Sequence, residues 1–473
     1  MFHIWLLVLA MLWMCCCSSS SSGGANAKSY LAVNCRKHKF NLTEFGGVGD
    51  GKALNTEAFG KAITHLSQYA SDGGSLLIVP AGTWLTGPFN LTSNFTLYLD
   101  NGAVILASQK VEDYQLIAAL PSYGRGRDAP GGRFISLIFG TNLTDVVITG
   151  ENGVIDGQGQ LWWQMFKNNT LKNTRPYLIE IMHSSHIQIS NLKLVNSPSW
   201  VVHPVYSSDI IIEHLTISAP LDSPNTDGIN PDSCSNVRIW DNCIQSGDDC
   251  VAIKSGWDEY GTKFNMPSRQ ISIKRLTCVS PTSATVAIGS EMSGGVEDVR
   301  AEDITAINTE SGIRVKTTLG RGSYVRDIYL RNATFLKWMK YVFWVTADYS
   351  KKSDHPDDKY DPKAIPKVTG LSFSNITAQN VTYAGKLVGL KASPFADICI
   401  SNATIAMHID NDKKDENKKE PWNCTNVAGK WSSVTPPPCS LLVKTPGLQC
   451  GFPSDRLPIE NVKFQSCPLY GIK

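Results

Sequence analysis

Three acidic and two basic side chains gather in one stretch of the chain. The segments SPNTDGI, GDDC and SGIRVKT carry, in this order, Asp227, then Asp248 and Asp249, then Arg314 and Lys316. Neighbouring carboxylates disfavour each other's ionisation, so one of them is expected to keep a proton for a leaving-group oxygen while an ionised neighbour deprotonates water. Carboxylate pairs of this kind hydrolyse glycosidic bonds, and a basic pair suits a substrate that carries carboxylates.

Each of these motifs has a plain structural reading when it stands alone. Aspartate and asparagine are common turn residues, and a basic pair on a strand is most often a solvated face. What favours a catalytic site is the offset, because Asp227 precedes Asp248 and Asp249 by 21 and 22 residues. The elements that carry the motifs therefore decide between the two readings.

From about residue 180 onward, one pattern of apolar pairs separated by a polar turn pair repeats along the chain. Aligning Ile189, Ile212, Ile239, Ile273, Val299, Ile328, Phe373 and Ile400 gives steps of 23, 27, 34, 26, 29, 45 and 27 residues. Steps just above 20 residues with insertions are typical of a solenoid with one coil per repeat. No helical pattern separates the strands, which argues against a sheet or barrel of alternating strands and helices. We predict an all-β parallel β-helix of about ten coils.

One amphipathic helix is predicted near the start, over 56–70. Asn55 is its expected N-cap, and Ala58, Phe59, Ala62, Ile63 and Leu66 recur at helical spacing. This helix is placed to cover the open strand edges of the first coil. The cysteines Cys424, Cys439, Cys450 and Cys467 indicate a loop-rich C-terminal cap held by disulfides.

In such a stack, residues one coil apart lie roughly 4.8 Å from each other on one face. The three aspartates should therefore cluster. Arg314 and Lys316, at i and i+2 of a strand, should face the same side while Ile313 and Val315 point to the core. The site is thus expected to be a groove that crosses several coils.

The chain begins with an apolar run followed by small residues up to Ala27, which predicts a signal peptide over 1–27 and one folded domain over 28–473. A retained anchor is the alternative. Ten of the 13 cysteines lie beyond that leader, and ten Asn-x-Ser/Thr sequons are present. These features favour a secreted, extracellular or cell-wall glycoprotein. A formal net charge of +2 gives no field for nucleic acid or an anionic membrane, and we expect neither as a partner.

The ordered set SPNTDGI, GDDC and IRVKT resembles the polygalacturonases of glycoside hydrolase family 28 over about 45–349. The resemblance implies a right-handed parallel β-helix that hydrolyses α-1,4 galacturonan (pectin) with inversion and without a metal or cofactor. We separately expect a monomer. The resemblance also implies that Asp248 is the general acid and that Asp227 and Asp249 activate water. It further implies that Asn225 positions the site, that Arg314, Lys316 and Tyr349 bind substrate, and that Cys250 and Cys278 form a disulfide.

One position departs from the family's pattern. Ala284 stands where polygalacturonases generally carry a histidine, just before the segment IGS. A non-catalytic or weakly active pectin-binding wall protein is therefore a second hypothesis, and a hydrolase of rhamnogalacturonan or xylogalacturonan is a third. The segment GSEMSGG that follows resembles exo-acting relatives, so we expect attack from chain ends.

A few further residues leave two readings open. Lys254 is divided between cleft and surface, and Trp162 and Trp163 between packing and a platform for a sugar. His183, His186, His203 and His214 are expected to be structural or exposed. His355, in the acidic loop DHPDD, is the one tempting candidate to replace the missing histidine. The same segment could form a calcium site, but a solvated loop is the favoured reading.

Overall fold

The computed structural model describes residues 29–349, 361–408 and 420–469. The predicted leader over 1–27 and the DHPDD loop with His355 lie outside the described residues. Within them, no helix is both long and apolar enough to cross a membrane.

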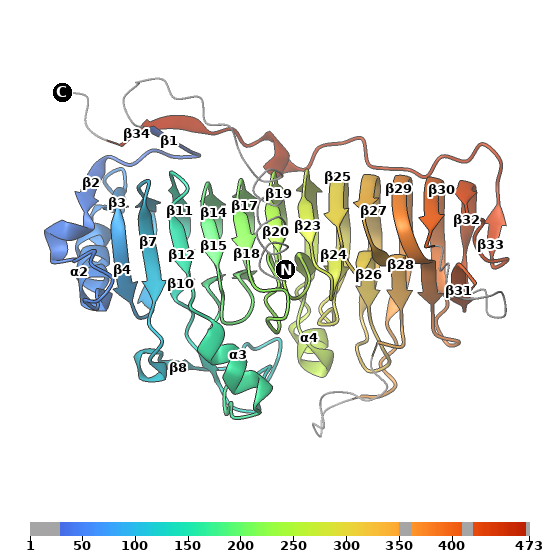
Figure 1. Cartoon of the computed structure of the whole chain (residues 1–473), viewed down its shortest axis with the longest axis horizontal. Coiled ribbons are helices and arrows are strands. Elements are labelled where there is room, and N and C mark those ends of the chain that lie inside the picture. Colours follow the sequence, from blue (N-terminus) through green and yellow to red (C-terminus); the bar gives the residue numbers. More distant parts are fainter. Residues whose placement is uncertain (1–28, 350–360, 409–419, 470–473) are drawn as a thin grey trace, which may run out of the picture.

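The described chain winds into a stack of coils whose strands lie in three parallel rows (Figure 1). The prediction of an all-β, right-handed parallel β-helix is confirmed. The first row, called the site row here, contains β5 (Phe89–Asn90), β10 (Ile138–Thr141), β13 (Ile179–Met182), β16 (Val202–Val205), β21 (Val251–Ile253), β24 (Ala284–Ile288), β26 (Ser311–Lys316), β28 (Met339–Thr346), the end of β29 (Lys367–Val388) and β31 (Trp422–Thr425).

The second row forms the longest face. It contains β2 (His38–Asn41), β3 (Ser75–Val79), β6 (Phe95–Leu99), β11 (Thr144–Gly150), β14 (Ser185–Ser190), β17 (Ser208–Glu213), β19 (Ser235–Trp240), β22 (Ser268–Lys274), the first parts of β25 (Val296–Ile307), β27 (Tyr324–Leu336), β29, β30 (Phe395–Met407) and β32 (Val427–Thr435), and then β33 (Leu442–Lys444).

The third row completes each coil. It contains β4 (Gly82–Thr86), β7 (Ala103–Ala107), β12 (Val154–Asp156), β15 (Lys193–Val195), β18 (Thr216–Ser218), β20 (Cys243–Gln245), β23 (Thr277–Val279) and the second parts of β25, β27, β29, β30 and β32. The short pair β8 (Leu116–Ile117) and β9 (Arg133–Phe134) is antiparallel and lies outside these rows.

The core is built from apolar side chains that repeat at one register in successive coils. Ile189, Ile212, Ile239 and Ile273 pair in this order, as the repeat predicted. The predicted alignment is wrong at the next two coils, because Ile273 pairs with Ala301, and Ala301 with Leu330, each two residues beyond the predicted partner. The side chains at i and i+2 of a strand both face the core, so a two-residue shift leaves the apolar pattern unchanged.

Helix α2 (Thr56–Leu66) covers the N-terminal coil, and its five predicted apolar residues are buried. The ring of Phe59 stacks on Phe89 with 4.3 Å between the centroids, which joins the helix to the first site-row strand. Asn55 holds the N-cap position, but its side chain makes no capping hydrogen bond there. Its carboxamide instead bonds the backbone of Val48 and Leu85, which ties the helix start to the neighbouring coil.

Two further helices sit in loops of the site row, α3 (Gln160–Lys167) and α4 (Asp258–Phe264), both below the stack in Figure 1. The C-terminal tail runs back along the stack, and β34 (Gln465–Pro468) pairs antiparallel with β1 (Ser29–Ala32). Disulfides in the described residues join Cys35 to Cys467, Cys250 to Cys278, Cys399 to Cys450 and Cys424 to Cys439. The predicted cap is thus stapled by one local bridge and by two that reach into the stack.

Candidate active site

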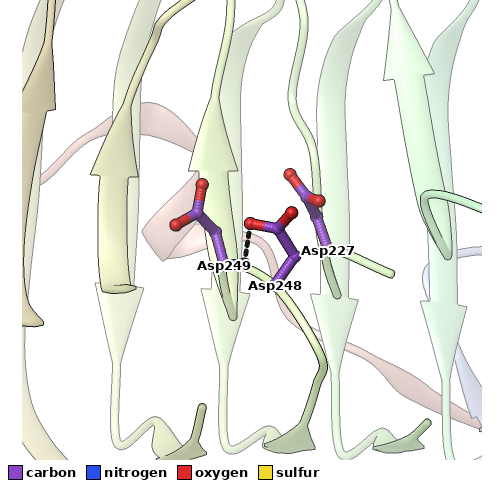
Figure 2. Close-up of side chains that lie close together, drawn as sticks. All are labelled: Asp227, Asp248 and Asp249. Atoms are coloured by element: carbon purple, nitrogen blue, oxygen red, sulfur yellow. Dashed lines mark hydrogen bonds between the residues drawn. The ribbon is translucent and has the colours of Figure 1, made fainter. Parts of the chain in front are cut away.

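The three aspartates lie in two loops of the site row that stack one coil apart. Asp227 follows β18, and Asp248 and Asp249 precede β21. The strand residues beside them, Ile229 and Val251, form a parallel bridge, which fixes the register of the two loops. One oxygen from each carboxylate lies within 4.8 Å of the other two. Figure 2 shows Asp248 between Asp249 and Asp227.

Asp249 is the most firmly held of the three. Its carboxylate is fully buried and accepts hydrogen bonds from the Ser283 hydroxyl at 2.5 Å, the Ala284 N–H at 3.1 Å and the Lys316 ammonium at 2.5 Å. Burial alone would raise the pKa of Asp249, but the charges of Lys316 and Arg314 outweigh it and lower that pKa. Asp249 is therefore an ionised, immobile carboxylate.

Asp227 is equally buried but less well compensated. Its nearest cation is the Lys254 ammonium, whose nitrogen lies 3.4 Å from the carboxylate. Burial and the negative charge of Asp248, opposed by Lys254, raise the pKa of Asp227 to about 7. In the free protein this carboxyl keeps a proton at mildly acidic pH.

Asp248 is half-buried and is the acid of the three that reaches the surface. Its carboxylate accepts hydrogen bonds from the Asp249 N–H at 2.9 Å and from the Asn225 amide at 3.4 Å. Arg175 donates to the Asn225 oxygen at 2.7 Å, which turns the amide nitrogen of Asn225 toward Asp248. Asp248 is thus positioned by neutral groups, whereas its two neighbours each contact an ammonium group.

The two cations come from one strand, β26, with Ile313 and Val315 buried beneath them. The Arg314 guanidinium lies 3.8 Å above the Trp344 ring and 3.3 Å from Glu310. Its Nε is buried and has no hydrogen-bond partner in the described structure. The burial of Lys316 would lower its pKa, but Asp249 outweighs this and raises it.

Tyr349 lies at the edge of this pair. Its ring centroid is 5.6 Å from the Arg314 guanidinium carbon and 5.6 Å from the Lys316 nitrogen. Tyr349 is 40% exposed, so part of it remains accessible to solvent. The structure therefore brings together all seven residues named from the sequence.

A second layer of charges beneath the aspartates was not foreseen from the sequence. Lys254, left open between cleft and surface, is buried and bonds Glu291 at 3.2 Å as well as Asp227. Arg127 reaches the same glutamate at 3.2 Å, and both cations lie over the Trp200 ring. The segment GSEMSGG, already singled out in the sequence, contains Glu291. Arg127 lies more than 100 residues earlier and belongs to no motif, so the sequence did not indicate it.

Ala284 offers no imidazole to the site. Its methyl group is buried against Ala252 and Ala287, and only its backbone N–H contacts Asp249. His203, the buried histidine of the site row, instead lies between Glu180 at 3.0 Å and Asp232 at 3.3 Å. That geometry is structural, as the sequence predicted for this residue.

Three clustered carboxylates can also bind a cation, and these are close enough to share one. Two of them already have ammonium partners, Lys316 and Lys254, at 2.5 Å and 3.4 Å. The acids and lysines therefore balance each other's charge within the protein itself. This balance fits acid–base chemistry at a glycosidic bond.

The sequence of the site can be compared with known families. The model of glycosyl hydrolases family 28 matches residues 110–433, which include both acid loops and β26. The chain belongs to this family. It is therefore a glycoside hydrolase, and the family 28 resemblance noted from the motifs is confirmed.

Relatives and a solved structure agree with the family 28 assignment. The chain is 58% identical over 449 residues to a protein of Vitis vinifera named "Probable polygalacturonase", covering 94% of this chain and 89% of that one. It is 26% identical over 413 residues to an exopolygalacturonase of Zea mays, covering 82% and 87%. The crystal structure of a hyperthermoactive exopolygalacturonase from Thermotoga maritima superposes with a TM-score of 0.68 at 29% identity, covering 79% of this chain and 88% of the other.

Proposed function

We propose that this family 28 chain hydrolyses the α-1,4 linkages of galacturonan, the acidic backbone of pectin, with Asp248 as general acid. The observation that carries the proposal is the contrast within the acid cluster. Asp248 faces the surface without an ammonium partner, while Asp249 and Asp227 lie beneath it, each beside a lysine. The relatives named as polygalacturonases support the choice of substrate.

In the proposed reaction, Asp248 gives its proton to the glycosidic oxygen as the bond between that oxygen and the anomeric carbon breaks. Water attacks the anomeric carbon and passes its proton to Asp249, which is ionised in the free protein. Asp249 then releases this proton to solvent, and Asp248 regains a proton from Asp227, which holds one below a pKa of about 7 and takes up another from solvent. The acid cluster starts and ends the cycle with the same number of protons.

The stereochemical outcome of this reaction is part of the proposal. The nearest oxygens of the three carboxylates lie within 4.8 Å of one another. In glycosidases, a separation of about 5–5.5 Å between the two carboxyl groups is typical of retaining enzymes, so distance alone favours retention over inversion. Retention, however, needs a carboxylate that can bond the sugar. Asp249 is buried and fixed by Ser283, Ala284 and Lys316, which supports activation of water and hence inversion. Proton NMR of the first product anomer distinguishes the two outcomes.

The Arg314 guanidinium and the Tyr349 ring are proposed to bind a galacturonate carboxylate and sugar face. Arg314 keeps an unpaired buried Nε and lies against Trp344, so its guanidinium plane is fixed before a ligand arrives. A planar fork matches a carboxylate in two simultaneous hydrogen bonds.

Attack from chain ends is also proposed. The loop 118–132 bridges several coils of the site row, where the Ser122 carbonyl accepts from the Trp257 N–H at 2.8 Å and Arg127 bonds Glu291 at 3.2 Å. This crossing lies beside Trp200 and Lys254, on the Asp227 side of the cluster. A groove closed on one side of the acids admits only the end of a polymer.

The experiment that tests the function is a product profile by mass on polygalacturonate, rhamnogalacturonan and xylogalacturonan. We expect monogalacturonate release from polygalacturonate, falling about 10²–10⁴-fold in Asp248→Asn. Internal fragments would contradict end attack, and turnover confined to another polymer would replace the substrate. Oligogalacturonate binding without any turnover would favour the pectin-binding protein that Ala284 suggests.

We further propose that the protein is a secreted, monomeric cell-wall enzyme formed by one domain over 28–473. Disulfides favour an oxidising compartment, and the pairing of β1 with β34 joins the C-terminal tail to the N-terminal part of the stack. Immunodetection in the wall fraction and light scattering of the purified protein test these points.

A further inference from the structure

A cavity lies beside helix α3, and none of the three aspartates of the acid cluster lines it. Its volume is about 510 Å³, within the range of roughly 300–1,000 Å³ that holds drug-sized ligands. Amide side chains and one indole dominate its lining, namely Gln109, Gln158, Gln160, Trp163, Gln164 and Asn196.

The faces of α3 separate this cavity from the active site. Gln160, Trp163 and Gln164 lie at i, i+3 and i+4 and share the face toward the cavity. On the other side, Phe166 packs 4.0 Å from the guanidinium of Arg175, the residue that holds Asn225. The loop 219–228 is divided in the same way, since Asp222 lines the cavity and Asp227 belongs to the acids.

The cavity walls are held in place without a ligand. A Cβ at Gly159 would lie 2.6 Å from the Ser197 carbonyl oxygen, so only glycine lets the start of α3 approach this turn. The Trp163 indole N–H donates to the same oxygen at 3.0 Å. Asp156 accepts from the Gln158 N–H at 2.9 Å and from the Asn196 amide at 3.2 Å. The indole and Asn196 are therefore fixed before binding.

The other polar side chains of the lining are three amides without hydrogen-bond partners among the described residues and one ion pair, so together they carry almost no net charge. In the described structure the amides of Gln109, Gln160 and Gln164 form no side-chain hydrogen bond, and all three residues are exposed. Amides donate and accept at once, which matches vicinal hydroxyl groups. The single lysine among the lining residues, Lys167, is paired with Asp222 at 3.2 Å. The lining therefore offers no unpaired cation to the carboxylate of an acidic sugar.

We propose that this cavity binds an uncharged oligosaccharide through its amides, against the Trp163 indole that lines it. The site complements the catalytic groove, which carries Arg314 for an acidic chain, and the proposal does not depend on the hydrolytic function. The uncharged sugar could belong to a neutral branch of the polymer being cut or to a separate wall glycan, and both share the chemistry that the amides recognise.

The test is calorimetric titration of the intact Asp248→Asn protein with galactotetraose, arabinotetraose and tetragalacturonate. We expect a neutral tetrasaccharide to bind and to lose at least about 10-fold in affinity in the Gln160→Ala/Gln164→Ala variant, as the loss of hydrogen bonds predicts. The same titration should be unchanged in Gln68→Ala, a matched exposed glutamine in the 3-10 turn that follows α2, and in Arg314→Ala. Tetragalacturonate should show the opposite pattern.

Two further arms sharpen the test. Asn168 follows α3 directly and is a sequon, so each titration is repeated in Asn168→Gln to exclude an attached glycan. A galacturonate oligomer bearing a neutral branch should bind more tightly than either part if the branch and the backbone come from one polymer, and no tighter if they do not. Absence of neutral-sugar binding at about 10 mM, or its loss in Arg314→Ala but not in the glutamine variant, overturns the proposal.

Discussion

The ammonium of Lys316 lies 2.5 Å from the carboxylate of Asp249, and both groups are buried. This contact gives different roles to Arg314 and Lys316, which the sequence analysis treated as one basic pair that binds substrate. Lys316 compensates a buried negative charge, whereas Arg314, two residues earlier on β26, is only partly buried and lies between Glu310 and the Trp344 ring. The two residues should therefore fail in different ways when they are replaced.

Arg314→Ala is expected to raise KM by about 10–100-fold with a smaller change in kcat, because it removes a charge-assisted contact to the substrate carboxylate. Lys316→Met should lower kcat and also destabilise the fold by about 3–5 kcal/mol, since it leaves Asp249 as an uncompensated buried charge. Steady-state kinetics and urea unfolding measure both effects. Arg326→Ala, on the second row and half exposed, is the control that should change neither.

The raised pKa of Asp227 predicts that stability depends on pH. A carboxyl whose folded pKa of about 7 exceeds its ordinary value of 3.8 binds protons more readily in the folded state. Its favourable contribution is complete below about pH 4 and is lost as the pH rises through 7. Asp227→Asn should therefore be stabilised relative to the wild type increasingly between these limits, as read from urea midpoints. A difference that is constant with pH would contradict the prediction.

Lys254→Met should shift the pH profile of the reaction upward. The positive charge of Lys254 lowers the pKa of Asp227, so its removal lets Asp227 hold its proton to higher pH. Asp227 is protonated near pH 5 with or without the lysine, so we expect little change in kcat there and an alkaline limb, set by loss of the Asp227 proton, that moves to higher pH. Lys254→Arg keeps the charge over Trp200 and should retain the profile more closely than the methionine variant. An unchanged profile in Lys254→Met would show that the lysine only fills space.

The helix over the first coil gives a prediction about stability alone. Phe59→Ala should cost about 3–5 kcal/mol, because the ring is fully buried and stacks on Phe89. Gly60, the next residue, is exposed, and a Cβ there would meet nothing within 4 Å. Gly60→Ala should therefore gain about 0.5–1 kcal/mol through helix propensity. Urea unfolding measures both, and equal effects would mean that the helix does not pack as a cap.

The sequence predicted the features that recur from coil to coil and missed the contacts that occur only once. The one-coil offset between Asp227 and Asp248 was readable because a solenoid converts sequence distance directly into spatial position. The registers at Ala301 and Leu330 were not readable, because both inward positions of each strand are apolar. A period of two residues cannot tell one from the other.

The second layer of charges was hidden for a different reason. Lys254 lies in a coil and could be flagged, but Arg127, which pairs with the same Glu291, comes from a loop whose path follows no repeat. The same holds for Arg175, whose contact with Asn225 joins segments 50 residues apart. The path of a loop inserted between coils is set by its own contacts and not by the repeat, so the positions of its side chains can be known only from the structure.

β1 pairs with β34 near the two ends of the described chain, and the Cys35–Cys467 bridge beside them joins residues 432 positions apart. A linear stack of coils can ordinarily unravel from either end, where the last coil has a neighbour on one side only. Here the two ends are tied across the length of the stack, so the polypeptide is a closed circuit. A single proteolytic cut in an exposed loop would open that circuit without releasing a fragment. The bridge can also form only after almost the whole chain has been synthesised, so the first coils are made before this restraint exists.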